Sequence, residues 1–528
     1  MGALTLKNFP FTLRSWTVKS YSSIDPTDSF GQSTKVYINK NQIVKIEPQF
    51  SVYEKTQWLT DKGRHFFDSI LIKNLFVKTV QKWEIFFKNI NKTFYVFDIC
   101  NFKTANRNFF ILVFENMSIE VLNFLFLIAQ NYSFLKLRRA ENSKLNSDLE
   151  TNFQINSTIS PQALLHSSLV ILIGLNPRIE GSHLNLKLRQ RYFKGNFKLF
   201  SIGSSLDLTF PVLFLGSNLS ILKNLLEGNL LYCKDFVMSA NPILITNTES
   251  FKHASNLQNI MNHIKILMHT NILNRIWCGF NILNSSLYET GFHSCGFSSF
   301  LSFKDLIFFS SLYLINVNLN NIGNFKKITE SRLLSYKGFS KLHNKKLLLI
   351  QNFKFSSSNI LKHLLLKNYL YLPNNVFFES QESFINTEGL IKKTTKFISR
   401  KNTKNDWQLL RKFVKILQSN TMLSSIKNNK NVFYNSKSLF AFKNFISFQY
   451  QATKALTNLN FYLYFKNQKF VSYKKFNRFK ILPKKFFATK LKYWLDDYYT
   501  GGKDLFCQNS LLLTQCSINY RIQMTNFF

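Results

Sequence analysis

The alternation of hydrophobic and polar positions changes character along this chain of 528 residues. In the first 66 residues, hydrophobic side chains alternate with polar ones in short segments, such as Lys35 to Ile38 and Ile43 to Ile46, around Gly31 and Pro48. A period of two is typical of half-buried β-strands. The pattern therefore predicts a small β-rich domain over residues 1–66.

From residue 67 onward, short apolar strands alternate with amphipathic helices. The clearest strand is the uninterrupted apolar run from Ser168 to Ile173, which is typical of a strand buried on both faces of a parallel sheet. Further strands are predicted at 197–202, 242–245, 312–317 and 347–350, and helices at 180–193, 218–226, 257–268 and 406–417. This alternation predicts a doubly wound α/β region over residues 67–420, with helices on both sheet faces.

The remaining segment, 421–528, is rich in Lys, Phe and Asn and gives weak secondary-structure signals, so we expect a basic C-terminal segment. The whole chain has a net charge of +40 and 57 Phe, and no acidic residue lies between Asp406 and Asp496. Lys, Phe and Asn share AT-rich codons, so coding bias in an organellar genome explains much of this composition. The acid-free stretch 407–495 also fits an acidic neighbouring subunit or a phosphate backbone as partner.

Hydropathy indicates that the chain does not cross a membrane. A membrane span needs roughly 18 consecutive apolar residues. The best candidate, Phe109 to Ala129, is interrupted by Glu115 and Glu120. We therefore expect a soluble protein, or a peripheral one on a membrane complex.

The cysteines do not form a metal-binding pattern. No two of the six are spaced as C-x2-C, and His293 with Cys295 lacks a second pair at ligand spacing. The adjacent Asp496 and Asp497 are typical of a solvated helix end, and neither G-x-S-x-G nor H-E-x-x-H occurs. We predict no metal ligand and no catalytic residue in this chain.

One turn lies where doubly wound folds bind phosphates. The predicted strand ending at Ile173 is followed by Gly174-Leu-Asn-Pro-Arg178 and then by a helix. The glycine-rich sequences G-x-G-x-x-G and G-x4-G-K-[ST] are both absent. From the residues alone, the turn is either a generic phosphate site or a structural connection between strand and helix.

Several motifs, each weak alone, form an ordered set. They are G-A-L-T from Gly2, S-I-D-P-T-D-S-F-G-Q-S from Ser23, L-I-G-L-N-P-R-I-E from Leu172, N-T-E-G from Asn386, and Asp406-Trp407. The set closely resembles the large (75 kDa-type) iron–sulfur subunit of respiratory complex I. In that family Cys-Pro-Val precedes G-A-L-T and the cysteine ligates a cluster, whereas Met1 stands here in place of the valine. The resemblance implies the cluster-free C-terminal part of a split, mitochondrion-encoded subunit.

The resemblance also implies the fold of molybdopterin oxidoreductases without their cofactor. Where the family has N-T-E-G-R-x-Q, this chain has Leu390 in place of the Arg and Lys392 in place of the Gln. Loss of the Arg removes a bidentate phosphate-binding group. We therefore interpret the cofactor site as vestigial, and expect no cofactor in this chain. The candidate residues for the vestigial site are Asn176, Arg178, Asn386 and Glu388.

By this resemblance the chain is a scaffold in the matrix arm of NADH:ubiquinone oxidoreductase (H⁺-translocating), at the mitochondrial inner membrane. Implied partners are a separately encoded N-terminal polypeptide carrying the iron–sulfur clusters and the flavin-bearing and quinone-side subunits, with no nucleic acid. The charge and the interleaved aromatics of 407–495 favour an alternative, an organellar RNA-binding protein. A third hypothesis is an active molybdopterin oxidoreductase.

Overall fold

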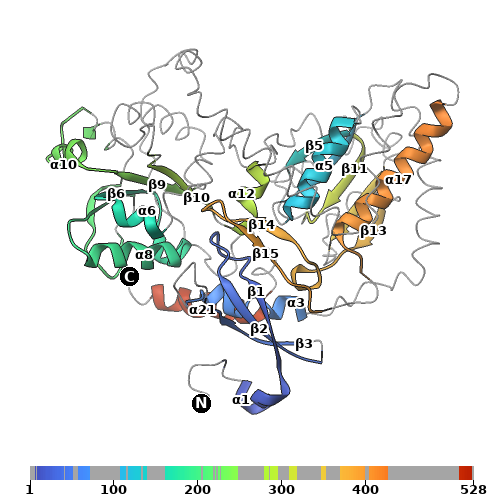
Figure 1. The fold of residues 1–528 in the computed structure, drawn as a ribbon, viewed down its shortest axis with the longest axis horizontal. Coiled ribbons are helices and arrows are strands. Elements are labelled where there is room, and N and C mark those ends of the chain that lie inside the picture. Colours follow the sequence, from blue (N-terminus) through green and yellow to red (C-terminus); the bar gives the residue numbers. More distant parts are fainter. Residues whose placement is uncertain are drawn as a thin grey trace.

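The structure, a computed structural model, covers the chain in separate ranges. The residues it describes are 6, 9–40, 42–50, 58–71, 108–114, 117–131, 135–139, 161–203, 206–217, 221, 224–225, 227–247, 277, 279–284, 286–294, 309–317, 347–352, 369–398, 403–425 and 510–525. They form two α/β lobes above a small antiparallel sheet (Figure 1). The predicted helix 257–268 and most of the predicted helix 218–226 lie outside the described residues.

The N-terminal region is an antiparallel sheet, as its two-residue period predicted. Strands β1 (Lys19–Ile24), β2 (Ser33–Asn39) and β3 (Gln42–Pro48) pair in that order. Two short helical segments, α1 (Phe9–Thr12) and η1 (Ser15–Thr17), precede them. Helices α2 (Asp61–His65) and α3 (Asp68–Leu71) follow, and the Thr60 hydroxyl caps α2 by accepting from the Gly63 backbone N–H at 3.0 Å.

The first lobe contains a five-stranded parallel sheet in the order β8-β7-β6-β9-β10. Its strands are β6 (Leu169–Ile173), β7 (Lys198–Ile202), β8 (Leu213–Gly216), β9 (Ile243–Asn247) and β10 (Phe280–Leu283), and its helices are α6 (Pro161–His166), α7 (Pro177–Glu180), α8 (Ser182–Phe193) and α10 (Cys233–Met238). The strands predicted at 168–173, 197–202 and 242–245 are confirmed. Every residue of β6 and β9 is buried, as expected for central strands of a covered parallel sheet.

Helices cover both faces of this sheet. On one face, Val170 and Leu172 of β6 pack in one core with Leu184 and Leu188 of α8. On the other face, the ring of Phe200 in β7 lies 5.9 Å from that of Phe236 in α10. The predicted helix 180–193 is confirmed, although α7 ends at Glu180 and Gly181 separates it from α8.

The second lobe contains another parallel sheet, in the order β5-β4-β11-β12-β13. Its strands are β4 (Asn108–Val113), β5 (Leu135–Arg139), β11 (Phe309–Ile315), β12 (Leu347–Asn352) and β13 (Tyr369–Pro373), and its helices are α5 (Ile119–Asn131), α12 (Leu287–Ser294) and α17 (Asp406–Ser425). The strands predicted at 312–317 and 347–350 are confirmed. The helix predicted at 406–417 is also confirmed and extends to Ser425.

In sequence, the first lobe is inserted between two segments that together form the sheet of the second lobe. Strands β4 and β5 precede the first lobe in sequence, and β11, β12 and β13 follow it. Helices α5 and α17 pack side by side on the second sheet, in a core that includes Phe109 and Tyr313 (Figure 1). The apolar run from Phe109 to Ala129 is therefore a buried strand and helix, and no described helix is both long and apolar enough to span a membrane.

A central core joins the N-terminal sheet to the second lobe and to the last described helix. Val36 and Ile38 of β2 share it with Leu287 of α12, Phe378 of the 3₁₀ helix η8 (Phe377–Glu379) and Leu513 of α21 (Leu511–Thr525). The hairpin of β14 (Ser383–Ile385) and β15 (Ile391–Lys393) continues from η8. This core thus contains residues from all three predicted regions, whose limits at 66 and 420 remain predictions.

Truncating Phe378 tests this shared core. Its side chain is fully buried and its ring lies 5.6 Å from that of Phe66 and 5.1 Å from that of Phe397. We expect Phe378→Ala to lower the free energy of unfolding by about 3–5 kcal/mol in urea titrations of the purified chain. The control Leu231→Ala removes a side chain that is 94% exposed and should change it by less than about 0.5 kcal/mol. Equal effects of the two variants would contradict the shared core.

Candidate functional site

Each parallel sheet has one point where its strand order reverses, and ligands of doubly wound folds bind there, beyond the carboxyl ends of the strands. In the first lobe the reversal lies between β6 and β9, and in the second it lies between β4 and β11. These two switch points are the positions at which a cofactor or substrate is expected.

At the switch point between β6 and β9, a carboxylate of the chain itself is bonded to the turn. Glu180 accepts a hydrogen bond from the Asn176 backbone N–H at 3.1 Å through Oε2 and another from Asn247 Nδ2 through Oε1. Asn176 Oδ1 in turn accepts from the Arg178 backbone N–H at 3.2 Å and caps α7. Glu180 thus takes donors that a bound phosphate would need.

Arg178 is directed to a partner within the same lobe. Its Nη1 lies 2.6 Å from Asp207 Oδ2 and donates to the Asp207 carbonyl oxygen at 3.2 Å. A hydrogen bond from the Thr209 backbone N–H and the contact with Arg178 lower the pKa of Asp207. Both side chains of the pair are largely exposed, so this bridge contributes little to stability.

The strands next to the β4/β11 switch point end in a buried network of amides around one carboxylate. Asp406, at the start of α17, accepts from Asn374 Nδ2 at 2.8 Å, Gln351 Nε2 at 2.9 Å and Asn316 Nδ2 at 3.4 Å. The Tyr313 hydroxyl donates to Gln351 Oε1. Burial raises the pKa of Asp406, while the three amide hydrogen bonds oppose that rise.

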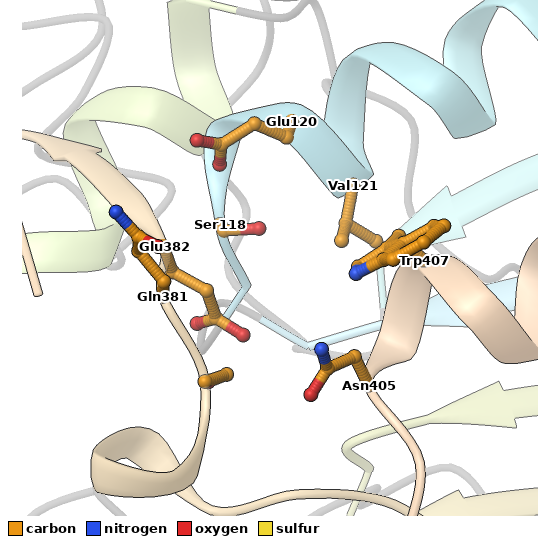
Figure 2. A pocket seen from close by; sticks show the side chains of 8 residues that line it. Ser118, Glu120, Val121, Gln381, Glu382, Asn405 and Trp407 are labelled. Carbon is orange, nitrogen blue, oxygen red and sulfur yellow. The ribbon is translucent and has the colours of Figure 1, made fainter. Parts of the chain in front are cut away.

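A cavity of about 10 Å³ lies beside this network, which is roughly the room of one water molecule. Figure 2 shows three of the side chains around it: Glu120 of α5, Glu382 just before β14, and Trp407 of α17. Burial raises the pKa of Glu120, and burial together with the charges of Asp406 and Glu120 raises the pKa of Glu382 to about 8. Several carboxyl groups thus gather here, with their neutral forms favoured by burial. Within the described ranges no group of three or more His, Cys, Asp or Glu residues is arranged to hold a metal ion.

A third cluster of buried polar groups lies in the turn between β1 and β2. Every residue from Asp25 to Gln32 is buried, so this turn crosses the interior of the molecule. Lys187 of α8 places its Nζ 4.8 Å from the centre of the Phe30 ring and 2.5 Å from Glu388 Oε1. The side chains of Lys187 and Glu388 are each only 4% exposed, so their ion pair is shielded from water.

Asn386 and Thr387 bind the backbone of the same turn. Asn386 Nδ2 donates to the Phe30 carbonyl at 3.2 Å, and the Thr387 backbone N–H donates to the Ser29 carbonyl at 3.1 Å. His183 contacts the Phe30 ring, and burial together with the charge of Lys187 lowers its pKa to about 3, so the imidazole is neutral. We call residues 25–32 with Lys187, Asn386, Thr387 and Glu388 the junction cluster.

The four residues predicted for a vestigial site thus bond to two separate sets of partners. Asn176 and Arg178 bond within the first lobe, whereas Asn386 and Glu388 belong to the junction cluster. Sequence reasoning assigned no role to the carboxylates at the switch points or to the amides at the strand ends. A signal was available for the amides, because Asn316 and Asn374 each directly follow a short, largely apolar run, 312–315 and 369–373.

The family model of molybdopterin oxidoreductases, described as "Molybdopterin oxidoreductase", matches residues 106–416. The chain belongs to the molybdopterin oxidoreductase family. The predicted α/β fold of this family is therefore confirmed, and its region covers both parallel sheets.

Curated relatives carry closely similar descriptions. The NADH-ubiquinone oxidoreductase 75 kDa subunit of Reclinomonas americana is 25% identical over 81% of this chain and 61% of its own length. The 75 kDa subunit of Acanthamoeba castellanii is 26% identical over 78% of this chain and 57% of its own length. The mitochondrial NADH-ubiquinone oxidoreductase 78 kDa subunit of Neurospora crassa is 22% identical over 56% of this chain and 41% of its own length. The resemblance predicted from the motifs is confirmed, and the chain spans less than two thirds of the relatives it matches.

The family name implies a molybdopterin cofactor, which carries a phosphate group, and the described switch points can be tested for fit. A phosphate needs cationic side chains or unoccupied N–H donors. Glu180 instead accepts from the turn after β6, Arg178 is paired with Asp207, and the other switch point adjoins Glu120 and Asp406. The described residues at the two switch points therefore do not fit the cofactor.

Breaking the buried ion pair of the junction cluster tests its structural role. We expect Lys187→Met to lower the free energy of unfolding by about 3–5 kcal/mol, because it leaves Glu388 buried without its cation. The double variant Lys187→Met/Glu388→Leu should recover most of that loss, since no uncompensated charge remains. Urea titration of the purified chain at pH 6 measures both, and Arg178→Met, which breaks an exposed pair, is the control. A loss for Lys187→Met no larger than for the control would contradict the assignment.

The junction cluster also predicts how stability depends on pH. Burial, together with the charge of Asp25, raises the pKa of Asp28 from 3.8 to about 7. Between these values the folded chain holds a proton that the unfolded chain has lost, so the free energy of unfolding falls as the pH rises from about 4 to about 7.

The variant Asp28→Asn lacks this titration. Relative to the original chain, it should gain stability by on the order of 2–4 kcal/mol between pH 4 and pH 7, measured by urea titration at several pH values. Asp207→Asn is the control, because the pKa of Asp207 is lowered and its removal should not give a gain in this window. Parallel pH profiles for the original chain and Asp28→Asn would contradict the prediction.

Proposed function

We propose that the chain is the cluster-free α/β part of the large iron–sulfur subunit of NADH:ubiquinone oxidoreductase, acting there as a scaffold and not as a redox carrier. The observation that carries this proposal is that groups of the chain itself bond to one another at the first switch point and beside the second. Glu180 holds the turn after β6, and Asp406 is saturated by amides at the other sheet. A site of this kind has fixed internal partners and little room for a substrate or cofactor.

In this proposal the electrons pass through clusters carried by another polypeptide. The six cysteines of this chain lack the paired spacing by which iron–sulfur clusters are bound. A separately encoded N-terminal polypeptide would supply the clusters, and the flavin-bearing and quinone-side subunits would be its neighbours. This chain would contribute a rigid surface that orients the cluster-bearing polypeptide and excludes water from it.

The proposed place is the matrix side of the mitochondrial inner membrane, in the peripheral arm of the complex. Relatives named as mitochondrial subunits support this location. The H⁺-translocating NADH:ubiquinone reductase activity would belong to the assembled complex, and no residue of this chain would act on NADH or ubiquinone.

Native electrophoresis tests the proposal. We expect the chain to migrate in the band that oxidises NADH, with mass spectrometry identifying in that band a polypeptide that carries cluster motifs. Depletion of the chain should lower the NADH oxidation of that band at least tenfold, whereas the purified chain alone should oxidise no NADH.

Three results would overturn the proposal. The first is migration apart from NADH dehydrogenase activity. The second is an RNase-sensitive particle, which would support the RNA-binding alternative. The third is stoichiometric molybdenum or tungsten in the purified chain, which would support an active molybdopterin oxidoreductase.

A further inference from the structure

Among the described strands, β1 forms the outer edge of the N-terminal sheet and pairs with β2 alone. In Figure 1, α1 and β1 to β3 project below the two lobes. From Arg14 to Ser22, every residue except Val18 is exposed, and the side chain of Trp16 is 82% exposed. Phe11, in α1 just before this stretch, is 89% exposed. An edge strand beside exposed aromatic side chains is normally covered, because its free backbone groups pair readily with another strand.

The exposed stretch leads into a groove. Residues Ser22 to Ile24 at the end of β1 line a groove of about 470 Å³ together with Phe50 on one side and Ile391 and Lys393 of β15 on the other. Among the described residues, β1 pairs with β2 along one edge, and the opposite edge receives a hydrogen bond from Thr395 Oγ1 to the Ser22 carbonyl. The groove is therefore bordered by a strand edge, apolar side chains and an ammonium group.

The exposed charged side chains that the structure describes on the N-terminal sheet and on the β14–β15 hairpin are basic. Arg14, Lys19, Lys35, Lys40 and Lys393 are exposed on the sheet and on the adjoining hairpin. In residues 9–50 the carboxylates are directed elsewhere, because Asp25 and Asp28 are buried in the turn and Glu47 lies 2.6 Å from Lys45. A positive surface with an apolar groove is complementary to a ligand that carries carboxylates beside an apolar side chain.

We propose that β1 and this groove dock an extended acidic segment of another protein, which adds a strand to the free edge of β1. Main-chain hydrogen bonds to β1 give the affinity of such strand addition, and the groove takes an alternate apolar side chain between Phe50 and Ile391. Lys19 and Lys393 then face carboxylates of the segment. The strand edge and the apolar groove walls favour a polypeptide over a nucleic acid, whose binding depends mainly on phosphate contacts. This inference rests on the proposed function, because the acidic segment is sought among the other polypeptides of the NADH-oxidising complex.

Zero-length carbodiimide cross-linking of the purified NADH-oxidising complex tests this docking, because it joins only amines and carboxylates in contact. We expect Lys19 and Lys393 to be joined to Asp or Glu of a second polypeptide. Acetylation of the same two lysines by acetic anhydride should be at least fivefold slower in the complex than in the full chain alone. Lys194, exposed at the end of α8 in the first lobe, should react equally in both.

Matched variants separate docking from folding. Lys19→Glu and Trp16→Ala should each lower recovery of the cross-linked second polypeptide about tenfold, while the purified variant chains keep the urea midpoint of the original. Lys194→Glu and Phe193→Ala change exposed residues of the first lobe and should leave that recovery unchanged.

The docking proposal is overturned if Lys19 and Lys393 stay as reactive in the complex as in the full chain, or if RNase restores their reactivity. Its failure is distinguishable from failure of the proposed function. A chain that migrates with NADH dehydrogenase activity but keeps both lysines reactive refutes the docking alone, and a chain absent from that band refutes the proposed function.

Discussion

The buried turn between β1 and β2 is the constraint on which the arrangement of the molecule depends. A turn that crosses the interior must satisfy its backbone groups with protein partners, because water does not reach them. Its partners come from far along the chain, since Asn386 and Thr387 bind the carbonyls of Phe30 and Ser29. Gly31 has a φ of +59° and approaches Leu287 so closely that a Cβ atom would lie 2.7 Å from that side chain. These contacts fix the position of the N-terminal sheet relative to α8, to α12 and to the segment after β13.

Electrostatics in the junction reinforce that arrangement. Lys187 and Glu388 belong to elements 201 positions apart in sequence, and their pair forms out of contact with water. A buried ion pair contributes little net free energy to folding, but separating its partners costs several kcal/mol, about 3–5, because a charge is then buried without its counter-ion. We infer that the pair contributes mainly specificity, because an arrangement of the first lobe that separates Lys187 from Glu388 leaves a buried charge without its partner. Asp28, protonated in the folded chain below about pH 7, avoids adding a further buried negative charge beside Asp25.

Electrostatics also account for the carboxylates at and beside the two switch points. At the carboxyl ends of parallel strands, backbone N–H groups and helix starts favour negative charge. In this chain Glu180 provides that charge from within, and Asp406 collects the amides at the ends of β11, β12 and β13. Internal carboxylates satisfy these donors at no cost in association entropy, because they belong to the same chain. In the proposed scaffold role, function depends on surfaces, and the positive, aromatic edge of β1 is the surface that we propose for docking.

The sequence by itself determined several of the elements and the family. Local patterns were sufficient for β6, β7, β9, β11, β12 and α17, because burial of a strand or of one helix face imposes a period that is visible over a few residues. The ordered motifs from Ser23 to Trp407 identified the relatives, although they did not give the reason for each residue. Thus Asn386 and Glu388 were placed in a cofactor site by resemblance alone.

Only the tertiary structure decided the division into two sheets, with one lobe built between β5 and β11, and the separate partners of Asn176, Arg178, Asn386 and Glu388. Lys187 is an example of a role that local sequence patterns do not reveal. In sequence it is one basic residue among many on a helix, and its role depends on Glu388, which lies 201 positions away. Pairing across such separations depends on which elements pack together, and local periodicity carries no information about that.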